Sequence, residues 1–556
     1  MLIKNAWKLG SGIFFDKALR KKIIGLCFFS IMFEFTVVFF QYILSYWSNS
    51  FYTALQNFDK DALYNIMLQF CLLVVASVII VAFRYTFQAK LAIVWRQWMT
   101  QFYIDKWLSH NAYFGINLLT NKNDNPDQRI SDDVNSFIGL TISITLGFLN
   151  SVVTLMSFLF LLWKLSGDTK FNIFNLEINI SGYFVWIAII YSIIGTLVTY
   201  VIGKKLTFLD YARERREANF RFSLMRLREN SESIALYNGA EYEKSIFKDI
   251  FEKIVNNFHD IIKITRNLTS WNNLYFNFSN ILPIAVTLPK FFAKEIQLGD
   301  LMQISSAFSQ VHSALSFFIN SFSMIASYKA AISRLLEFNT NVDMWNNKVE
   351  SFTVNFIKSD KIELKNIEIY LPNGNALLPN IDLSFENGHS YLLTGENGAG
   401  KSTLCKVIGG IWPFAKGEIN IMKKNEIFFI PQKIYMPFGL LKDVITYPLK
   451  NLEKEEQIKF LLKKFNISYL NDRLNQEELW SNTLSVGEQQ KISIMRAIIA
   501  NPKVLIMDES TSALTETDEQ LIFSVLKELL KDVTIISVGH RGGLRDCHLH
   551  EIKIGA

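Results

Sequence analysis

Residues that build disulfide frameworks and zinc sites are scarce in this chain of 556 residues. It has four cysteines, and they are scattered without CxxC or Cys/His ligand spacing: Cys27, Cys71, Cys405 and Cys547. Neither a disulfide scaffold nor a zinc site is therefore expected. Charged residues are also few, at 19%, and the net charge is only +6. This composition argues against a disordered chain or one that wraps nucleic acid.

Apolar residues, in contrast, make up half of the chain, and aromatic residues make up 14%. Nearly all of the long apolar runs lie before about residue 330. This uneven distribution predicts a membrane domain followed by a soluble domain.

Six segments are candidates to cross a membrane, since a spanning helix needs about 20 mostly apolar residues. They are 23–47, 67–87, 137–165, 183–202, 271–292 and 301–326. The last two are more polar, and Pro283 interrupts the fifth. Their polarity is compatible with helices that face a water-filled cavity. The alternative is that one of these two is a buried amphipathic helix.

Lysine and arginine gather before the first span and between the fourth and fifth. The positive-inside rule then places four regions in the cytoplasm: the N-terminus, 88–136, 203–270 and everything after 327. The first apolar run is too long for a cleavable signal peptide and lacks a cleavage site. Residues 1–22 are expected to form an interfacial segment.

The two long cytoplasmic segments show charged and apolar residues at helical spacing, as in 211–236. They are predicted to be extensions of the spanning helices. A helix continued by 20 residues reaches about 30 Å beyond the membrane. This reach suggests mechanical coupling to a soluble domain.

A phosphate-binding loop is predicted at residues 391–403, which read YLLTGENGAGKST. The segment fits GxxxxGK[ST] between an apolar strand and the start of a helix. Its glycines let backbone N–H groups converge on phosphates, Lys401 reaches the outer phosphates, and the Ser402 hydroxyl binds Mg²⁺.

Residues 504–509 read VLIMDE, an apolar strand that ends in two acids. Asp508 is placed to hold Mg²⁺, and Glu509 is placed to orient and activate the attacking water. The alternative is an ordinary buried strand that ends in a charged turn. Upstream, LSVGEQQ (484–490) opens a helical pattern and makes a second anion site. Downstream, IISVGHR (535–541) puts His540 at the end of a strand.

These motifs, in their order and spacing, resemble the nucleotide-binding domain of ABC transporters. The resemblance implies that Tyr370 stacks on adenine, that Gln432 couples the γ-phosphate to the membrane domain, and that Glu509 and His540 are catalytic. It also implies that LSVGEQQ caps the ATP bound to the other protomer. The implied ATP-binding residues are Tyr370, Gly395, Glu396, Asn397, Gly398, Ala399, Gly400, Lys401, Ser402, Thr403, Gln432, Ser485, Gly487, Glu488 and Asp508, with Ser402, Gln432 and Asp508 as Mg²⁺ ligands.

Three positions depart from the family pattern. Val486 replaces the first glycine of the common LSGGQ signature, and Glu488 replaces its glutamine. Thr515 stands where the family usually has an aspartate that helps to organise the partner's phosphate loop. This last change puts the tightness of subunit coupling in doubt.

Further segments resemble the SbmA/BacA-like and ABC subfamily D branch, which includes bacterial cobalamin and peptide transporters and acyl-CoA transporters. These segments are NPDQRISDDV (125–134), SESIALYNGAEYE (231–243), GGIWPFAKGEI (409–419) and PQKIYMPFGLLKDVITYP (431–448). The candidates for coupling in the first two are Asn125, Asp127, Arg129, Glu232 and Glu241. The alternative is a generic exporter-type half-transporter.

One membrane half fused to one nucleotide-binding domain is half a transporter, and a homodimer is the simplest assembly. The expected fold is an α-helical membrane domain of six transmembrane helices followed by an α/β P-loop NTPase domain. The expected boundaries are an N-terminal segment at 1–22, a membrane domain at 23–330, a linker at 331–350 and the ATPase at 351–556. A bacterial inner membrane is the expected location.

The expected function is ATP-driven uptake of a medium-to-large hydrophilic or amphipathic compound such as cobalamin or a peptide. The alternatives are a long-chain acyl-CoA or lipid transporter and an ATP-gated channel or sensor. A soluble ABC ATPase of DNA repair or translation is excluded by the membrane spans.

Glu34 interrupts the first span between two phenylalanines. A carboxylate in hydrocarbon is costly, so Glu34 is expected to face a cavity or a partner. Arg84, near the cytoplasmic end of the second span, is the candidate partner, or it snorkels to the interface.

Overall fold

The computed structural model describes residues 2–119, 125–166, 168–173, 176–317, 321–352, 354–359, 361–421, 426–449, 454–539 and 542–555. The chain divides into two units. The first, here called the helical unit, comprises Met1–Lys106 and Asp124–Asn339. The second, the sheet unit, comprises Trp107–Asn123 and Thr340–Ala556. A short segment from the first half of the sequence therefore belongs with the C-terminal half.

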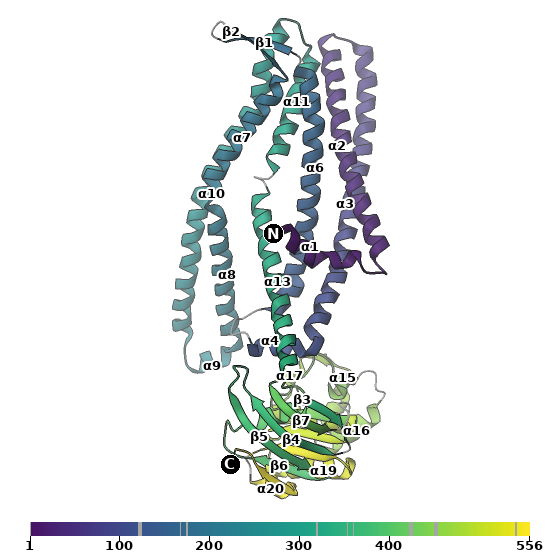
Figure 1. Cartoon of the computed structure of the whole chain (residues 1–556), viewed down its shortest axis with the longest axis vertical. Helices are drawn as coiled ribbons and strands as arrows, with labels where there is room; N and C mark the ends of the chain where they lie inside the picture. The colour runs from purple at the N-terminus through teal and green to yellow at the C-terminus, as the bar shows by residue number, and fades with distance from the viewer. Residues whose placement is uncertain are drawn as a thin grey trace. The chain divides into compact units, whose positions relative to one another are not determined.

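Helices, most of them long, build the helical unit (Figure 1). They are α1 (Leu2–Gly10), α2 (Arg20–Gln56), α3 (Lys60–Leu108), α6 (Val134–Ser166), α7 (Tyr183–Gly203), α8 (Leu206–Glu229), α9 (Ser231–Leu236), α10 (Ala240–Phe292), α11 (Leu298–Leu315) and α13 (Phe322–Ser351), the last of which continues into the sheet unit.

Four helical stretches in the described residues are long and apolar enough to cross a membrane: Arg20–Gln56, Lys60–Leu119, Pro126–Ser166 and Tyr183–Glu229. They contain the first four predicted spans. The fifth falls in α10, which accommodates Pro283 and Pro289. The sixth begins in α11 and extends into α13, and residues 318–320 between them lie outside the described part.

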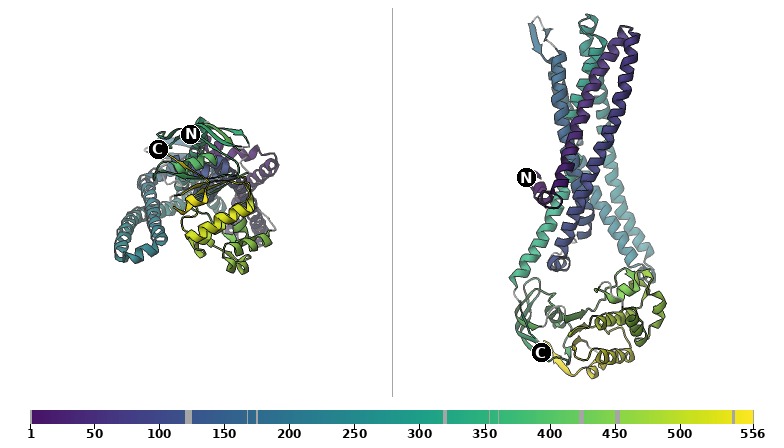
Figure 2. Two further views of the ribbon diagram at one scale, coloured as in Figure 1. Left: turned by 90° about the horizontal axis from the view of Figure 1, so that it is seen from below. Right: turned by 90° about the vertical axis from the view of Figure 1, so that its right-hand side faces the viewer.

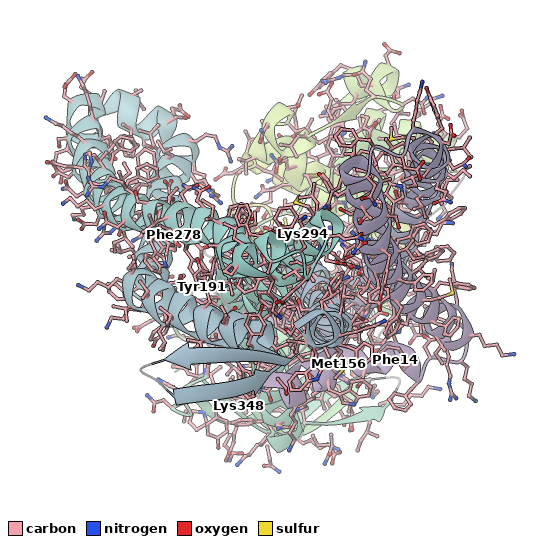
Figure 3. The ribbon with its side chains drawn as sticks, turned by 90° about the horizontal axis from the view of Figure 1, so that it is seen from above. Phe14, Met156, Tyr191, Phe278, Lys294 and Lys348 are labelled. Atoms are coloured by element: carbon pink, nitrogen blue, oxygen red, sulfur yellow. The ribbon has the colours of Figure 1, made fainter. Side chains whose placement is uncertain are left out.

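Large apolar side chains are exposed along α3, including Leu68, Leu72, Val75 and Val78. Lipid is as apolar as these side chains, so a surface of this kind is stable in a bilayer and would be unfavourable in water. Inside the unit, α6, α7 and α11 share a core that contains Phe158, Leu162, Phe184 and Phe308. Tyr191 of α7, labelled in Figure 3, stacks on Tyr275 of α10 with ring centroids 4.5 Å apart.

Within the described residues, the two segments predicted as helical extensions are largely helical. Helices α8 and α10 run side by side as a long hairpin closed by α9 (Figure 2). At 53 residues, α10 is about 80 Å long. A feature that the sequence did not predict is an antiparallel pair of strands between α6 and α7, β1 (Asp168–Ile173) with β2 (Leu176–Ser181).

Two larger sheets form the sheet unit. The first has the order β3-β7-β4-β5, from β3 (Val354–Lys358), β7 (Ala415–Ile421), β4 (Ile362–Tyr370) and β5 (Ala376–Phe385). The second is parallel, with the order β13-β6-β12-β11-β8, from β13 (His550–Lys553), β6 (Ser390–Thr394), β12 (Thr534–Val538), β11 (Val504–Asp508) and β8 (Ile427–Ile430).

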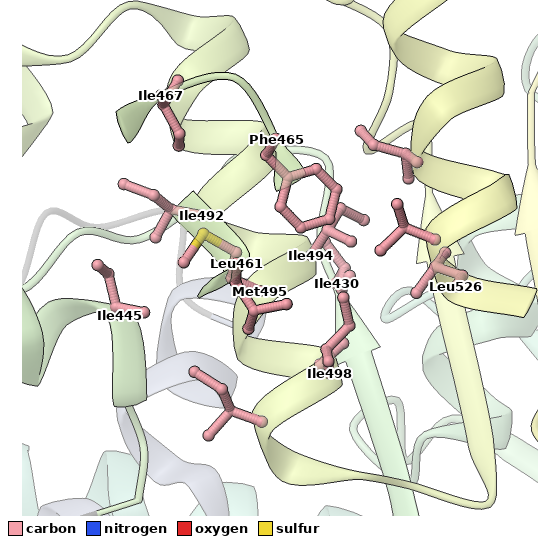
Figure 4. Close-up of a cluster of buried hydrophobic side chains, with 14 of the residues drawn as sticks. Ile430, Ile445, Leu461, Phe465, Ile467, Ile492, Ile494, Met495, Ile498 and Leu526 are labelled. Carbon is pink, nitrogen blue, oxygen red and sulfur yellow. The ribbon is translucent and has the colours of Figure 1, made fainter. Parts of the chain in front are cut away.

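The parallel strands carry helices on both faces, as buried parallel sheets require. Helix α14 (Lys401–Ile408) follows β6, and its Leu404 and Ile408 pack in the core between the two sheets. On the other side lies a larger core that includes α16 (Glu455–Lys464), α18 (Val486–Ala500) and α19 (Glu516–Leu529). Figure 4 shows part of this core, where Phe465, Met495 and Leu526 meet.

Two short strands, β9 (Gly439–Leu440) and β10 (Glu477–Glu478), complete the sheet unit. Its remaining described helices are α4 (Ala112–Leu119), α15 (Leu441–Thr446), α17 (Trp480–Thr483) and α20 (Gly543–Cys547), and the helical unit also contains the short α5 (Pro126–Gln128).

Candidate functional site

The loop between β6 and α14 has the backbone that a phosphate requires. Gly395, Gly398 and Gly400 all have positive φ, at 142°, 84° and 89°. A Cβ at Gly395 would lie 2.3 Å from the carbonyl oxygen of Ile554, so only glycine fits there. Glycines in such conformations let backbone N–H groups converge on a phosphate, and the dipole of α14 favours an anion at this end.

Lys401 is buried at the first position of α14, with 6% of its surface exposed. Its Nζ donates hydrogen bonds to the carbonyl oxygens of Gly395 and Glu396, both at 2.8 Å. The ammonium is therefore held inside the loop. A row of N–H donors around a fixed cation suits the phosphates of a nucleotide.

The next residue, Ser402, meets the end of β11. Its Oγ donates a hydrogen bond of 2.7 Å to Oδ1 of Asp508, which is 4% exposed. A hydroxyl and a carboxylate oxygen are hard ligands that suit Mg²⁺, which is usually bound by one or two carboxylates together with substrate phosphates. This donor set therefore fits the ion that the sequence predicts.

Glu509 follows Asp508 and has a left-handed backbone, with φ of 47°. Such a conformation costs a non-glycine residue energy and persists where the surrounding structure fixes it. Here the Glu509 N–H donates to the carbonyl of Val538 on the neighbouring strand, at 3.1 Å. The Glu509 carboxylate accepts a hydrogen bond of 2.7 Å from Nε2 of Gln432, which follows β8. The predicted water-activating acid and the predicted coupling glutamine are therefore in direct contact.

Tyr370 ends β4 and belongs to an aromatic group, with Phe352 at 5.7 Å between ring centroids. The backbone N–H of Tyr370 donates to the carbonyl of Phe414, and the Trp412 indole donates to the carbonyl of Tyr370. The Phe414 ring is fully buried and packs edge-on against Trp345 at 5.9 Å.

Trp345 connects this aromatic group to α4. The indole N–H of Trp345 donates to the carbonyl of His110 at 2.9 Å, and a Cβ at Gly115 would lie 2.1 Å from the indole ring. Lys348, labelled in Figure 3, reaches over the Phe414 ring and donates to the carbonyl of Pro372. The sequence did not predict this packing of residues 110–116 on the sheet unit.

The LSVGEQQ segment begins α18. Ser485 is the N-cap, and it forms a capping box with Glu488. Val486 is exposed, and Gly487 packs near Leu514. Among the described residues, the hydrogen bonds of the Ser485 side chain go to Glu488.

Thr515 is the N-cap of α19, where its Oγ1 accepts a hydrogen bond of 3.2 Å from the Asp518 N–H. Threonine caps a helix nearly as well as aspartate does, so the substitution preserves the start of this helix. His540 and the arginine that follows it lie outside the described residues.

The coupling candidates fall in two places. Asn125 precedes the short α5, Asp127 is exposed within it, and Arg129 begins a π-helical turn (Arg129–Asp133). Glu232 lies on α9, and Glu241 lies in the first turn of α10, 3.4 Å from Lys244.

Arg129 is also an internal ion-pair partner. It lies 2.8 Å from the Asp133 carboxylate, which is 3% exposed and also binds Arg334 of α13. Asp133 and Arg334 are 201 positions apart, so no local sequence pattern predicts their ion pair.

Glu34 is buried at the meeting point of three helices. Its carboxylate accepts hydrogen bonds from Gln88 of α3 at 2.7 Å and Asn150 of α6 at 3.0 Å, and Arg84 lies 3.5 Å away. Arg84 therefore is beside Glu34, and the two amides are partners that the sequence did not reveal.

A separate cavity of about 990 Å³ lies within the helical unit. Its lining combines apolar and aromatic residues with hydroxyls, an amide and charges, including Thr199, Tyr200, Lys204, Arg213 and Asn272. Neither Glu34 nor Arg84 lines it.

Comparison with known proteins agrees with this geometry. Residues 13–292 match the family model described as ABC transporter transmembrane region 2, and residues 378–512 match the model described as ABC transporter. The chain is 32% identical to the inner membrane ABC transporter ATP-binding protein YddA of Escherichia coli, with 91% of this chain and 90% of the relative covered. It is 26% identical to the mouse lysosomal cobalamin transporter ABCD4, with 91% and 87% covered.

Among solved structures, a bacterial Atm1-family ABC exporter with ATP bound has the same fold, with a TM-score of 0.73. The match covers 97% of this chain and 94% of the exporter, at 15% sequence identity. The expected fold, a helical membrane domain followed by a P-loop ATPase, is therefore confirmed. The chain belongs to the ABC transporters: it is a multi-pass membrane half-transporter, related to subfamily D, whose membrane region is fused to an ATP-hydrolysing domain.

Proposed function

We propose that this half-transporter works as a homodimer that uses ATP hydrolysis to move a medium-to-large amphipathic or hydrophilic compound, such as cobalamin or a peptide, into the cytoplasm. The observation that carries the proposal is the assembly of Lys401, Ser402, Asp508 and Glu509 at one phosphate-binding loop, in a chain whose helices line a large, open cavity.

The ATP site supports a simple division of labour. The loop N–H groups and Lys401 hold the phosphates, and Ser402 and Asp508 hold Mg²⁺ by their oxygen atoms. Mg²⁺ would neutralise charge on the phosphates during transfer. Glu509 orients the attacking water and accepts its proton. Gln432, which follows β8, donates a hydrogen bond to the Glu509 carboxylate and so connects it to that segment of the chain.

The cavity in the helical unit supports the class of substrate. Its volume is at the upper end of the range of about 300–1,000 Å³ that is usual for ligand sites. Leu197, Phe208 and Leu268 offer apolar surface, while Lys204 and Asn272 offer polar groups. A lining of this mixed kind suits a compound that has both apolar and polar parts.

The orientation and the location rest on the distribution of charge. Lysine and arginine are concentrated in the segments predicted to be cytoplasmic, which supports a cytoplasmic ATPase in a bacterial inner membrane. Cobalamin is proposed as a substrate because a relative with 26% identity bears the name of a cobalamin transporter. Uptake is proposed because the SbmA/BacA-like and subfamily D branch that the sequence resembles is associated with uptake.

The test is ATP turnover by the chain in lipid vesicles with Mg²⁺. Cobalamin, a cationic peptide and a long-chain acyl-CoA are added separately, and Glu509→Gln is the control. We expect one ligand to stimulate turnover and to be carried across the vesicle membrane. Stimulation by acyl-CoA alone would overturn cobalamin and peptides as the proposed substrates in favour of the acyl-CoA alternative. Ionic current without ligand flux would indicate a gated channel.

A further inference from the structure

Glu488 differs from the family's glutamine by a single group, and the structure shows what that group contacts. Its Oε2 accepts hydrogen bonds from the backbone N–H and from the hydroxyl of Ser485, both at 2.8 Å. Its other oxygen accepts a hydrogen bond from the Tyr469 hydroxyl. In return, the Glu488 N–H donates to Ser485 Oγ at 3.3 Å.

The Glu488 carboxylate is charged at neutral pH. Partial burial alone raises its pKa, but hydrogen bonds from Tyr469 and Ser485 outweigh burial and bring the pKa below its ordinary value. Tyr469 stays protonated, because desolvation and its bond to Glu488 raise its pKa to about 12. A charged acceptor therefore holds Ser485 across the whole physiological range.

This arrangement determines where the single proton of the Ser485 hydroxyl points. A serine hydroxyl has one hydrogen to donate, and here Glu488 accepts it. The Ser485 hydroxyl is exposed, but to a ligand outside the domain it can offer only the lone pairs of its oxygen. A glutamine at position 488 would offer a neutral amide oxygen to the same two Ser485 donors. A neutral acceptor holds a hydroxyl less strongly than a carboxylate does, so the proton would be released more readily to an external acceptor such as a phosphate.

We propose that Glu488, supported by Tyr469, is a latch that withholds the Ser485 hydroxyl from ATP and so raises the ATP concentration at which the two ATPase domains close. This inference rests on the proposed function, in which Ser485 faces the nucleotide bound to the partner. The carboxylate is a positioning group that acts through Ser485. Closure would require the Ser485 hydroxyl to leave Glu488 for the phosphate.

The test is the ATP dependence of turnover in the full chain in lipid vesicles, compared between wild type and Glu488→Gln. Glutamine also completes a capping box at this position, so α18 is expected to remain intact. Since a hydrogen bond to a charged acceptor is roughly twice as strong as one to a neutral acceptor, we expect the half-saturating ATP concentration to fall by roughly five- to tenfold, with little change in kcat. Glu477→Gln, which removes an exposed charge from the same domain, should leave both values unchanged.

A second comparison separates the latch from simple charge repulsion. In a Ser485→Ala background, Glu488→Gln should no longer change the half-saturating ATP concentration, because the hydroxyl through which it acts is gone. If Glu488→Gln still changes the half-saturating ATP concentration in the Ser485→Ala background, the latch is overturned. It is also overturned if Glu488→Gln alone leaves that concentration unchanged. Absence of Glu509-dependent turnover in the wild-type chain would overturn the proposed function and the latch together.

Discussion

At the scale of single residues, the ATP site depends on local backbone geometry that sequence can reveal. Gly395 and Gly400 adopt left-handed conformations, and Lys401 follows them at the start of a helix. A loop of this kind is encoded by adjacent residues, so its pattern predicts its shape. Tyr469 lies 19 positions before Glu488 and reaches it only through packing, so no local pattern indicated their contact.

His548 provides a residue-scale prediction about pH. Its ring is held between the Leu544 carbonyl at 2.7 Å and the Ser537 hydroxyl at 2.8 Å. Burial lowers its pKa below the ordinary value of 6.5, so the folded domain keeps this ring neutral while the unfolded chain takes up a proton. The contribution of neutral His548 to the free energy of unfolding is complete above pH 6.5. It is lost as the pH falls through the lower pKa of the folded state.

We therefore expect the thermal unfolding temperature of the chain in detergent to fall more between pH 7.5 and 5.5 for wild type than for His548→Gln. Glutamine can replace both hydrogen bonds and does not titrate. Equal losses in the two proteins would contradict this account.

At the scale of elements, the positions of helices were predictable but their contacts were not. Apolar runs predicted α2, α3, α6 and α7, because a helix that crosses a bilayer needs about 20 mostly apolar residues in succession. The strand pair β1–β2 and the contact of Trp345 with Gly115 depend on pairing between segments, which composition does not encode.

Glu34 provides a prediction about how α2, α3 and α6 hold together. Truncation to Ala would leave Arg84, Gln88 and Asn150 without their shared acceptor. Removal of one member of a buried ionic group costs about 3–5 kcal/mol, so we expect Glu34→Ala to unfold at a clearly lower temperature in detergent. Glu34→Gln keeps an acceptor and should lose less.

Thr36→Ala is the control, because that hydroxyl donates within α2 to the carbonyl of Met32. A Glu34→Ala protein as stable as wild type would refute the structural role. A Glu34→Gln protein with normal turnover and transport would exclude a direct role in function.

Gly115 provides a second prediction at this scale. A Cβ would enter the Trp345 ring, so Gly115→Ala is expected to destabilise the packing of α4 by about 1–3 kcal/mol. Adding Trp345→Leu should recover part of that loss by making room. Gly139→Ala is the matched control, since nothing lies within 4 Å of a Cβ there. Thermal unfolding of these three variants and of wild type measures this, and a tolerated Gly115→Ala would show that α4 packs elsewhere.

At the scale of the whole molecule, the proposed homodimer requires each ATP site to take its loop from one protomer and its Ser485 from the other. Lys401→Ala and Ser485→Ala chains should each retain only a small residual turnover alone. Mixed dimers would contain one intact site, so an equal mixture should recover at most about a quarter of wild-type turnover.

Turnover by the reconstituted mixture measures this recovery, with each variant mixed with itself as the control. No recovery in mixed dimers that have been shown to form would mean that each chain completes its own site.

If ATP hydrolysis at Glu509 drives transport through the helices of the same chain, the two activities must be coupled in sealed vesicles. The measurement is uptake of radiolabelled cobalamin or peptide together with ATP turnover, in wild type and Glu509→Gln. We predict that both activities occur together and that both fall by about 10²–10⁴-fold in the variant, the usual contribution of a general base. Ligand uptake that continues at the wild-type rate in Glu509→Gln would contradict the account.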